Sequence, residues 1–438
     1  MLLRATEIAD AVGGDVEGDD VEVASVTIDS RLATPGSLFV AIVAERDGHD
    51  YVVDAVAAGA VASLTARAVE VDATHIVVDD TDRALLDLGR HARSRLPDRI
   101  IGITGSVGKT TVKDLTRAAL AAQYDTHANE RSFNNELGVP LTLANTPERT
   151  EAVVVEMGAR GRGHIALLCD VARPTIGVVT AVELAHTELF GAIEEVAAAK
   201  AELVEALPSH GVAVLNADRP LVASMANHTD ARVLTFGLDA PGVDVTAESI
   251  EIDDELRASF VLRSPWGSAA VALPIAGLHQ VSNALAAVAA AMAAGVDVDR
   301  AAAGLGAATA SPWRMELGRA SSGLRVLNDA YNANPASTEA ALRSLASLPA
   351  RRRVAVLGRM AELGDHGPAE HRRMVELADE LGIDVIAVDA PDYGVDVVHG
   401  VDGARAALDA LALGEDDAVL VKGSRVAGLE RLASLLLA

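Results

Sequence analysis

The sequence contains little lysine, one cysteine and few aromatic residues. Of its 37 basic residues only four are lysine, at positions 109, 113, 200 and 422, so arginine fills nearly every position where any cation is sufficient. We therefore expect a remaining lysine to lie where a compact primary amine is needed and a planar guanidinium does not serve. The lone Cys169 excludes an intramolecular disulfide and a cysteine-based metal cluster. With only 3% aromatic residues, the core must consist of small and branched aliphatic side chains.

The chain also lacks a basic field and long apolar runs. A formal net charge of −26 over 438 residues argues against a general nucleic-acid binder or a binder of anionic membranes. A few arginines and backbone N–H groups can still form a local pocket for an anionic ligand. Residues 1–10 lack the apolar run of a signal peptide, and no later stretch reaches membrane-spanning length without charges or glycines. We expect a cytoplasmic protein and, by default, a monomer.

The spacing of apolar runs predicts an α/β fold with three domains, in keeping with the length of the chain. Short strands and an amphipathic start predict a small N-terminal α/β domain over residues 1–96. Buried parallel strands alternate with helices in a central domain over 97–312. Within this domain, apolar and polar residues alternate with a period of two between 244 and 274, which predicts a small antiparallel insertion. Strand–helix alternation restarts in a Rossmann-like α/β domain over 313–438.

A strand expected at 99–104 runs into a glycine-rich phosphate loop, Thr104-Gly-Ser-Val-Gly-Lys-Thr-Thr111. The first glycine of the usual spacing is replaced by Ile103, and Gly105 supplies the turn. Backbone N–H groups of such a loop and of the helix that follows surround phosphate oxygens. We assign ATP binding to the segment Gly105, Ser106, Val107, Gly108, Lys109, Thr110 and Thr111.

Within this loop, Lys109 is expected to reach the β- and γ-phosphates, and the hydroxyl of Thr110 to bind Mg²⁺. The alternative is an ordinary strand–helix turn with a surface lysine. Lys113 lies one turn into the helix, and for it we weigh a solvated position equally with a substrate contact. These residues make a nucleotide-driven enzyme the leading interpretation.

Glu156 follows the apolar run 153–155 and so lies at the carboxyl end of a predicted strand. Ligands bind at this edge of open α/β sheets. Because Mg²⁺ prefers hard oxygen ligands, Glu156 is a candidate metal ligand. A salt bridge at the strand end is the alternative.

Strings of residues along nearly the whole chain resemble the Mur ligase family of ATP-dependent amide-forming enzymes. The N-terminal strings resemble its UDP-binding segment, the central ones its catalytic domain, and the rest its C-terminal domain. Asn-Asn-x-x-Gly-Val-Pro and Tyr-Asn-Ala-Asn-Pro are specific to the branch that adds D-alanyl-D-alanine to a UDP-N-acetylmuramoyl-tripeptide. In chain order the strings occupy residues 28–31, 35–41, 45–50, 133–140, 155–158, 185–186 with Lys200, 328–335, 360–364 and 421–425.

The resemblance implies roles for single residues. Lys200 is expected to be carbamylated to N6-carboxylysine, which turns an ammonium into a carboxylate, a change that arginine could not readily make. With His186, Glu156 and Thr110 it would hold two Mg²⁺ ions. Asn283 would contact adenine, while Arg314, Asp329 and Asn332 close over ATP. The UDP-sugar–peptide and D-alanyl-D-alanine are assigned to Ser30, Arg31, Asn134, Asn135, Lys422, Ser424 and Arg425.

Each of these assignments has an ordinary alternative. Lys200 could be a surface helix lysine, His186 a structural histidine, Asn283 a helix N-terminal residue, and Arg31 half of a surface ion pair. Five positions depart from the family pattern without removing a metal or phosphate ligand: Ala44, Ala181, Ala201, Gln280 and Arg359.

The implied reaction moves the γ-phosphoryl group of ATP to the terminal carboxylate of the tripeptide, giving an acyl phosphate that the amine of D-alanyl-D-alanine attacks. The nearest alternative is another ligase of the family, or a folylpolyglutamate-type ligase, with a different amine donor. A nucleotide-gated regulatory protein is the alternative from another class, and in it the metal-binding residues would be expected to have decayed. The identity of the third residue of the tripeptide stays open.

Overall fold

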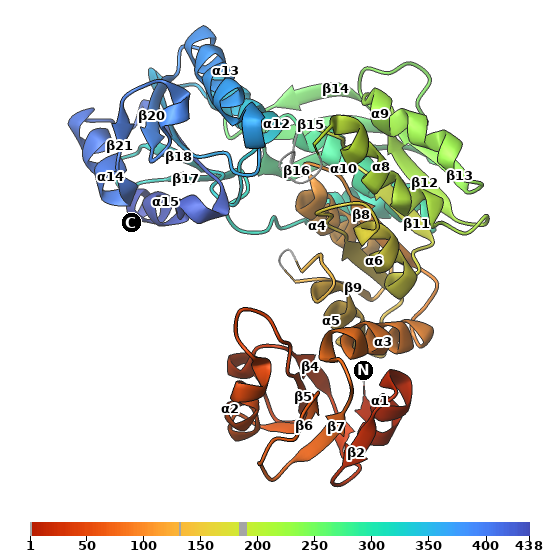
Figure 1. The fold of residues 1–438 in the computed structure, drawn as a ribbon. Helices are drawn as coiled ribbons and strands as arrows, with labels where there is room; N and C mark the ends of the chain where they lie inside the picture. Colours follow the sequence, from red (N-terminus) through yellow and green to blue (C-terminus); the bar gives the residue numbers. More distant parts are fainter. Residues whose placement is uncertain (1, 131–132, 184–190) are drawn as a thin grey trace.

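The computed structural model describes residues 2–130, 133–183 and 191–438. Three sheet-containing units follow one another along the chain, with the N-terminal unit at the bottom of Figure 1 and the other two above it. The predicted α/β class and the three-domain architecture are confirmed. No helix within these ranges is both long and apolar enough to cross a membrane.

The N-terminal unit is built on a five-stranded sheet of order β2-β7-β6-β5-β4, parallel except for the β2–β7 pair, with a two-stranded sheet of β1 and β3 beside it. Helix α3 leaves this unit and packs on α5 and α6 of the next one, so a single apolar core joins the two. The elements are β1 (Leu3–Arg4), α1 (Ala5–Val12), β2 (Asp15–Glu17), β3 (Glu22–Val23), β4 (Ser25–Thr27), β5 (Ser37–Val40), α2 (Val52–Ala57), β6 (Ala60–Thr65), β7 (Thr74–Val77) and α3 (Thr81–Ser94).

The central unit holds a six-stranded, fully parallel sheet of order β13-β12-β11-β8-β10-β9. The chain passes from β8 to one edge and later to the other, so the strand order reverses at β8, where such sheets bind ligands. The strands are β8 (Ile100–Thr104), β9 (Thr126–Ala128), β10 (Ala152–Glu156), β11 (Ile176–Val179), β12 (Val212–Asn216) and β13 (Arg232–Phe236). The helices are α4 (Lys109–Ala121), α5 (Gly138–Ala144), α6 (His164–Ala172), α8 (Ile193–Glu205), α9 (Pro220–Ala223), α10 (Gln280–Ala293) and α11 (Val298–Gly306).

Helices cover both faces of this sheet, which explains why its strands are continuous apolar runs. Alternate side chains point to opposite faces of a strand. Ile101 and Val154 therefore pack in the core with α4 and α10, whereas Ile100 and Val153 pack in the core shared with α3, α5 and α6.

The predicted antiparallel insertion is present as β14 (Thr246–Ile252), β15 (Arg257–Ser264) and β16 (Gly267–Ala276). Ser264 pairs with Gly267 across the two-residue turn, and Gly267 has φ +129°. Phe260 and Leu262 alternate inward from β15 onto the core that contains α10 and α11.

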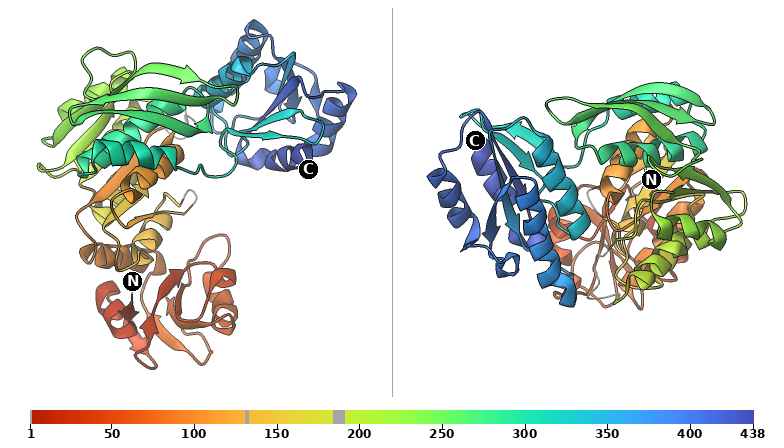
Figure 2. Two further views of the ribbon diagram at one scale, coloured as in Figure 1. Left: turned by 180° about the vertical axis from the view of Figure 1, so that it is seen from behind. Right: turned by 90° about the horizontal axis from the view of Figure 1, so that it is seen from above.

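The C-terminal unit has a six-stranded sheet of order β17-β18-β22-β19-β20-β21, in which only β17 runs antiparallel to its neighbour. Figure 2 shows it from two further sides, lying beside the central unit. Its elements are β17 (Glu316–Arg319), β18 (Arg325–Asn328), α12 (Pro335–Ser347), β19 (Arg352–Gly358), α13 (Gly367–Glu380), β20 (Asp384–Val388), β21 (Val397–Val398), α14 (Gly400–Ala410), β22 (Asp417–Lys422) and α15 (Glu430–Leu437).

Candidate active site

The phosphate loop joins β8 to α4 and has a backbone shape that only glycine permits at two positions. Gly105 has φ +150° and Gly108 φ +83°. A Cβ at Gly105 would lie 1.9 Å from Oγ1 of Thr180, and one at Gly108 would lie 2.6 Å from Oδ1 of Asn283. Both glycines therefore serve the close approach of neighbouring segments as well as the turn.

Hydrogen bonds to the end of β11 hold this loop in place. The N–H of Ser106 donates to the carbonyl of Ala181 at 2.8 Å, and the N–H of Glu183 donates to the Ser106 hydroxyl at 2.9 Å. Thr180 donates its hydroxyl to the carbonyl of Val107 at 2.6 Å. Position 181 contributes its backbone to this contact, so the alanine that departs from the family pattern is sufficient for it.

Lys109 folds back over the loop, where its Nζ donates to the carbonyl of Gly105 at 2.6 Å. Burial lowers the pKa of Lys109, Glu156 acts in the opposite direction, and Arg314 lowers it further. Phosphate oxygens entering the loop would offer this amine a stronger, charged acceptor.

Thr110 and Glu156 meet at the carboxyl end of the sheet. The Thr110 hydroxyl donates to Glu156 Oε2 at 2.8 Å, and Asn134 Nδ2 donates to Oε1 at 2.7 Å. The backbone N–H of Glu156 is held by Asn129 Oδ1 at 2.9 Å. Glu156 is buried, and these hydrogen-bond partners are neutral, so the bonds leave its negative charge for a cation.

Lys200 projects from α8 into the same cavity as Lys109. It is 4% exposed and has no hydrogen-bond or ion-pair partner among the residues that the structure describes. Burial, assisted by the nearby charge of Lys109, lowers the pKa of Lys200 well below its usual range. The uncharged, nucleophilic form of the amine is therefore more accessible here than at an exposed lysine.

Arg314 reaches the same group of residues from the C-terminal side. Its Nη2 donates to the Thr110 hydroxyl at 2.9 Å, and its guanidinium carbon lies 4.0 Å from the centre of the Tyr331 ring. The flanking residues Trp313 and Met315 have φ of +62° and +53°, a region that bulky residues rarely adopt.

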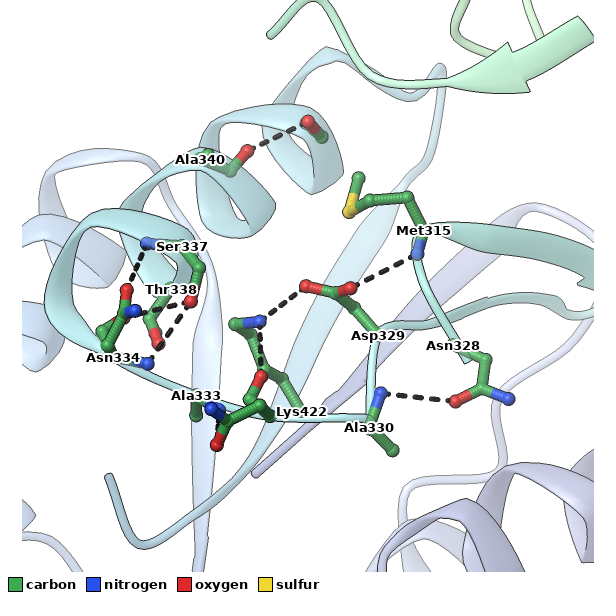
Figure 3. A network of polar contacts seen from close by, with 12 residues as sticks. Met315, Asn328, Asp329, Ala330, Ala333, Asn334, Ser337, Thr338, Ala340 and Lys422 are labelled. Atoms are coloured by element: carbon green, nitrogen blue, oxygen red, sulfur yellow. Dashed lines mark hydrogen bonds and ion pairs between the residues drawn. The ribbon is translucent and has the colours of Figure 1, made fainter. Parts of the chain in front are cut away.

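Asp329 and Lys422 form a buried ion pair at the ends of β18 and β22 (Figure 3). Asp329 also accepts the N–H of Met315 at 3.1 Å, and Lys422 donates to the carbonyl of Asn332 at 3.0 Å. Figure 3 also shows Asn334, which caps α12 by accepting the N–H of Ser337 at 2.9 Å. These bonds fix the strand ends that face the central unit.

At the start of α10, Asn283 donates its amide to Oε1 of Gln280 at 2.7 Å, which orients the side chain beside Gly108. The departure at position 280 thus supplies the partner of the residue expected to contact adenine. Nearby, burial lowers the pKa of His279 to about 4, while Asp329 acts to raise it and Lys422 to lower it.

A cavity of about 460 Å³ between the central and C-terminal units brings most of the predicted site residues together. Of the predicted residues it is lined by Ser106, Val107, Gly108, Lys109, Thr110, Thr111, Asn134, Asn135, Glu156, Lys200, Asn283, Arg314, Asp329, Asn332 and Lys422. His186 lies outside the described residues.

A second cavity of about 600 Å³ is lined from all three units and shares Asn134, Asn135 and Asn332 with the first. Ser424 and Arg425 line it, and the buried Ser424 hydroxyl has no hydrogen-bond partner among the described residues. Ser30 and Arg31 line neither cavity. Arg31 instead forms an exposed ion pair with Asp29 at 2.6 Å, which is the alternative considered for it.

Of the two positions weighed for Lys113, the structure excludes the solvated one. It is 3% exposed, which overturns the solvated interpretation, and it lies outside the lining of both cavities. Its Nζ donates to the carbonyl of Asn129 at 3.1 Å and lies 3.1 Å from Asp114 Oδ1. The scarcity of lysine in this sequence indicated a specific role, and in the structure Lys113 bonds α4 to the segment that follows β9. A contact with substrate stays a prediction.

Several residues in the site were missed by sequence reasoning. Thr180 bonds to the phosphate loop, Asn129 bonds to the backbone of Glu156, and Tyr331 stacks against Arg314. Arg160 and His164 line the first cavity. Thr180 and Asn129 lie at or just beyond strand ends, and a rule that scores polar residues there would have found them. Tyr331 begins the Tyr-Asn-Ala-Asn-Pro string, but no local pattern marks its contact with Arg314, 17 positions away.

The side chains suit a divalent cation. Glu156 and Thr110 offer hard oxygen atoms, and Lys200, which has no partner among the residues that the structure describes, lies in the same cavity. Within the described ranges, no three His, Cys, Asp or Glu side chains are grouped to hold a metal ion. Further ligands for such an ion would come from substrate or water oxygens, from a ring nitrogen of His186, or from a modified Lys200.

A phosphate-binding loop at the switch point of a parallel sheet, facing a second α/β unit across a cavity, defines an ATP-using enzyme. The Mur ligase middle domain matches residues 103–291, and the Mur ligase glutamate ligase domain matches residues 313–425. The chain belongs to the Mur ligase family of ATP-dependent ligases.

The similarity to known proteins extends over the whole chain. The UDP-N-acetylmuramoyl-tripeptide–D-alanyl-D-alanine ligase of Mycobacterium tuberculosis is 40% identical over 499 aligned positions, covering 100% of this chain and 98% of that protein. A crystal structure of MurF from Acinetobacter baumannii superimposes with a TM-score of 0.90 at 30% identity, covering 100% and 99% of the two chains. MurF from Thermotoga maritima, solved with ADP, gives a TM-score of 0.83 at 26% identity over 94% and 97%.

Proposed function

We propose that this ligase joins D-alanyl-D-alanine to a UDP-N-acetylmuramoyl-tripeptide, giving the UDP-N-acetylmuramoyl-pentapeptide precursor of peptidoglycan. The observation that carries the proposal is one cavity that holds the phosphate loop, Glu156, Lys200 and Arg314 together. Full-length similarity to enzymes named for this reaction supports it. Because the reaction consumes ATP, we place it in the cytoplasm.

The reaction must convert a carboxylate oxygen into a good leaving group. The γ-phosphoryl group of ATP moves to the terminal carboxylate of the tripeptide, which gives an acyl phosphate and ADP. The amine of D-alanyl-D-alanine attacks the acyl carbon, and phosphate leaves as the amide forms. Lys109, the N–H groups of the phosphate loop and Arg314 stabilise the negative charge on the transferring group.

The side chains that would hold Mg²⁺ are Thr110, Glu156 and modified Lys200, with His186 added from the family pattern. Two bound ions would neutralise the charge that accumulates between the triphosphate and the carboxylate. The protein atoms that carry this proposal are the buried Glu156 carboxylate and the Thr110 hydroxyl 2.8 Å away.

Lys200 is proposed to become N6-carboxylysine. Its neutral Nζ adds to the carbon of CO₂ and loses one proton, which leaves a carbamate anion in place of an amine. The lowered pKa of Lys200 favours the unprotonated reactant. A guanidinium, which stays protonated, does not react in this way.

For the substrates we assign Asn134, Asn135, Ser424 and Arg425 to the second cavity, and Lys422 to the boundary of the C-terminal unit. The Ser424 hydroxyl, which has no hydrogen-bond partner in the described part of the chain, supports a polar ligand there. Ser30 and Arg31 are proposed to contact the UDP-sugar end from the N-terminal unit. A substrate that touches all three units converts an encounter of separate molecules into a local reaction.

A phosphate-release assay tests the proposed function. We expect turnover of ATP that requires both UDP-N-acetylmuramoyl-tripeptide and D-alanyl-D-alanine, and mass spectrometry should detect the pentapeptide product. Turnover with another amine donor in place of D-alanyl-D-alanine would assign the protein to a different amide-forming activity. Turnover that neither substrate changes would contradict a ligase and favour a regulatory nucleotide switch. Diaminopimelate- and lysine-containing tripeptides, supplied separately, would identify the third residue.

A further inference from the structure

The segment that connects the central and C-terminal units runs along one face of α4. Ser311 donates its N–H at 2.9 Å and its hydroxyl at 2.6 Å to the same oxygen, Asp114 Oδ2. Three residues later, Arg314 donates to the Thr110 hydroxyl at 2.9 Å. Thr110 and Asp114 are four residues apart and so lie one turn apart on the same face of the helix. The connecting segment is therefore held to α4 at two successive turns.

ATP binding has different consequences for these two contacts. The Thr110 hydroxyl is the group we assign to Mg²⁺, so the bond from Arg314 must be exchanged when nucleotide and metal bind. Asp114 and Ser311 line neither of the two cavities described above. The Ser311 contact can therefore persist while the Arg314 contact is replaced.

Asp114 is also held from its other side. Its Oδ1 lies 3.1 Å from Lys113 Nζ, which donates to the carbonyl of Asn129, and Asn129 Oδ1 accepts the N–H of Glu156. Asp114 is 7% exposed and Lys113 3% exposed. A buried, paired carboxylate of this kind is a rigid anchor, because breaking the pair would leave an uncompensated charge.

We propose that Asp114 and Ser311 form a fixed pivot that positions Arg314 for phosphoryl transfer. The segment stays anchored at Ser311 while the guanidinium leaves Thr110 for the transferring group. The left-handed φ values of Trp313 and Met315 place the change of chain direction on either side of Arg314. Asp114 and Ser311 act through Arg314 and are therefore positioning residues. This inference rests on the proposed function, which requires Mg²⁺ at Thr110.

A double-mutant cycle tests the pivot. Ser311→Ala removes one hydrogen bond and should lower kcat of substrate-dependent phosphate release roughly fivefold to tenfold, with KM for ATP unchanged within about twofold. In an Arg314→Ala background the same Ser311→Ala change should lower kcat by less than about twofold, because the residue that it positions is gone. Asp114→Asn should follow the same pattern with a larger effect.

The control is Ser264→Ala, which removes a hydroxyl bonded to Gly267 in an exposed turn and should leave kcat at the wild-type value. Thermal unfolding of each variant separates folding defects from positioning. An equal loss of kcat from Ser311→Ala in both backgrounds would overturn the pivot, as would wild-type kcat in the single variant. A wild-type enzyme without substrate-dependent turnover would instead contradict the proposed function before any variant is compared.

Discussion

The two sides of the ATP cavity are built differently. On the phosphate-loop side, Ser106 and Thr110 bond to neighbouring segments, and Lys109 bonds to its own loop. On the other side, Lys200 is buried and has no partner in the described ranges. A buried polar group without a hydrogen bond destabilises the fold. We therefore infer that Lys200 is retained for a partner that the protein alone does not supply. The loop is preformed, whereas we propose that modification and ligands complete the Lys200 side.

The largest expected effect comes from changing the chemistry of position 200. Lys200→Arg should keep the fold and lower ligation by about a thousandfold or more, because a guanidinium cannot become a carbamate anion for a divalent ion. Steady-state ligation and thermal unfolding would be measured together. Lys200→Ala should regain part of the activity when short carboxylic acids are added. Near-normal turnover by Lys200→Arg would contradict the carbamate.

The phosphate-loop side of the cavity should instead be sensitive to the size of the side chain at a glycine position. Gly105→Ala places a Cβ 1.9 Å from the Thr180 hydroxyl, so the loop must shift. We expect ATP affinity to fall by about a hundredfold, equivalent to about 2.7 kcal/mol, as measured by calorimetry. The control is Gly414→Ala, where no atom lies within 4 Å of the new Cβ and affinity should not change. Wild-type affinity in Gly105→Ala would mean that the loop is not preformed.

His279 provides a pH test at the boundary between the units. Its pKa is lowered to about 4 in the folded protein, against about 6.5 when unfolded, so the unfolded state binds more protons in this interval. The free energy of unfolding should therefore decrease as pH falls from about 6.5 toward 4, by at most about 3 kcal/mol from this residue. Denaturant unfolding at several pH values would measure it. His279→Gln should flatten this dependence, and an unchanged slope would exclude His279 as its source.

The smallest effect on stability is expected at Arg31, whose side chain is 86% exposed. Arg31→Ala should leave the thermal unfolding midpoint unchanged, since surface ion pairs contribute little to stability. If Arg31 binds the UDP-substrate, KM for that substrate rises about tenfold while KM for ATP is unchanged. An unchanged KM for both would leave Arg31 as a surface ion pair.

Most of the fold could be predicted because its signals are local. Strand β10 matches the strand expected at 152–156, and the antiparallel insertion occupies 246–276, close to the region 244–274 where the apolar period is two. The antiparallel strand β17 was not predicted, because Glu316–Arg319 is short and has no apolar run. It is a strand only because it pairs with β18.

The site, like the fold, could be predicted only where its signals are local. Gly108, Lys109 and Glu156 are marked by spacing or by their position after apolar runs, and the structure brings them together in one cavity. Side-chain hydrogen bonds between distant segments hold the phosphate loop and the connecting segment in place, such as Thr180 to Val107 and Ser311 to Asp114. Their geometry depends on the packed sheet, and local patterns carry no information about it. The burial of Lys113 is of this kind.

The most direct test of the central claim is ¹³C NMR of the enzyme equilibrated with ¹³C-labelled bicarbonate and ADP with Mg²⁺. We predict one slowly exchanging carbamate signal in the wild-type protein. It should be absent from Lys200→Arg and retained in a folded Lys113→Arg variant. Wild-type enzyme that turns over its substrates under the same conditions but gives no carbamate signal would contradict it.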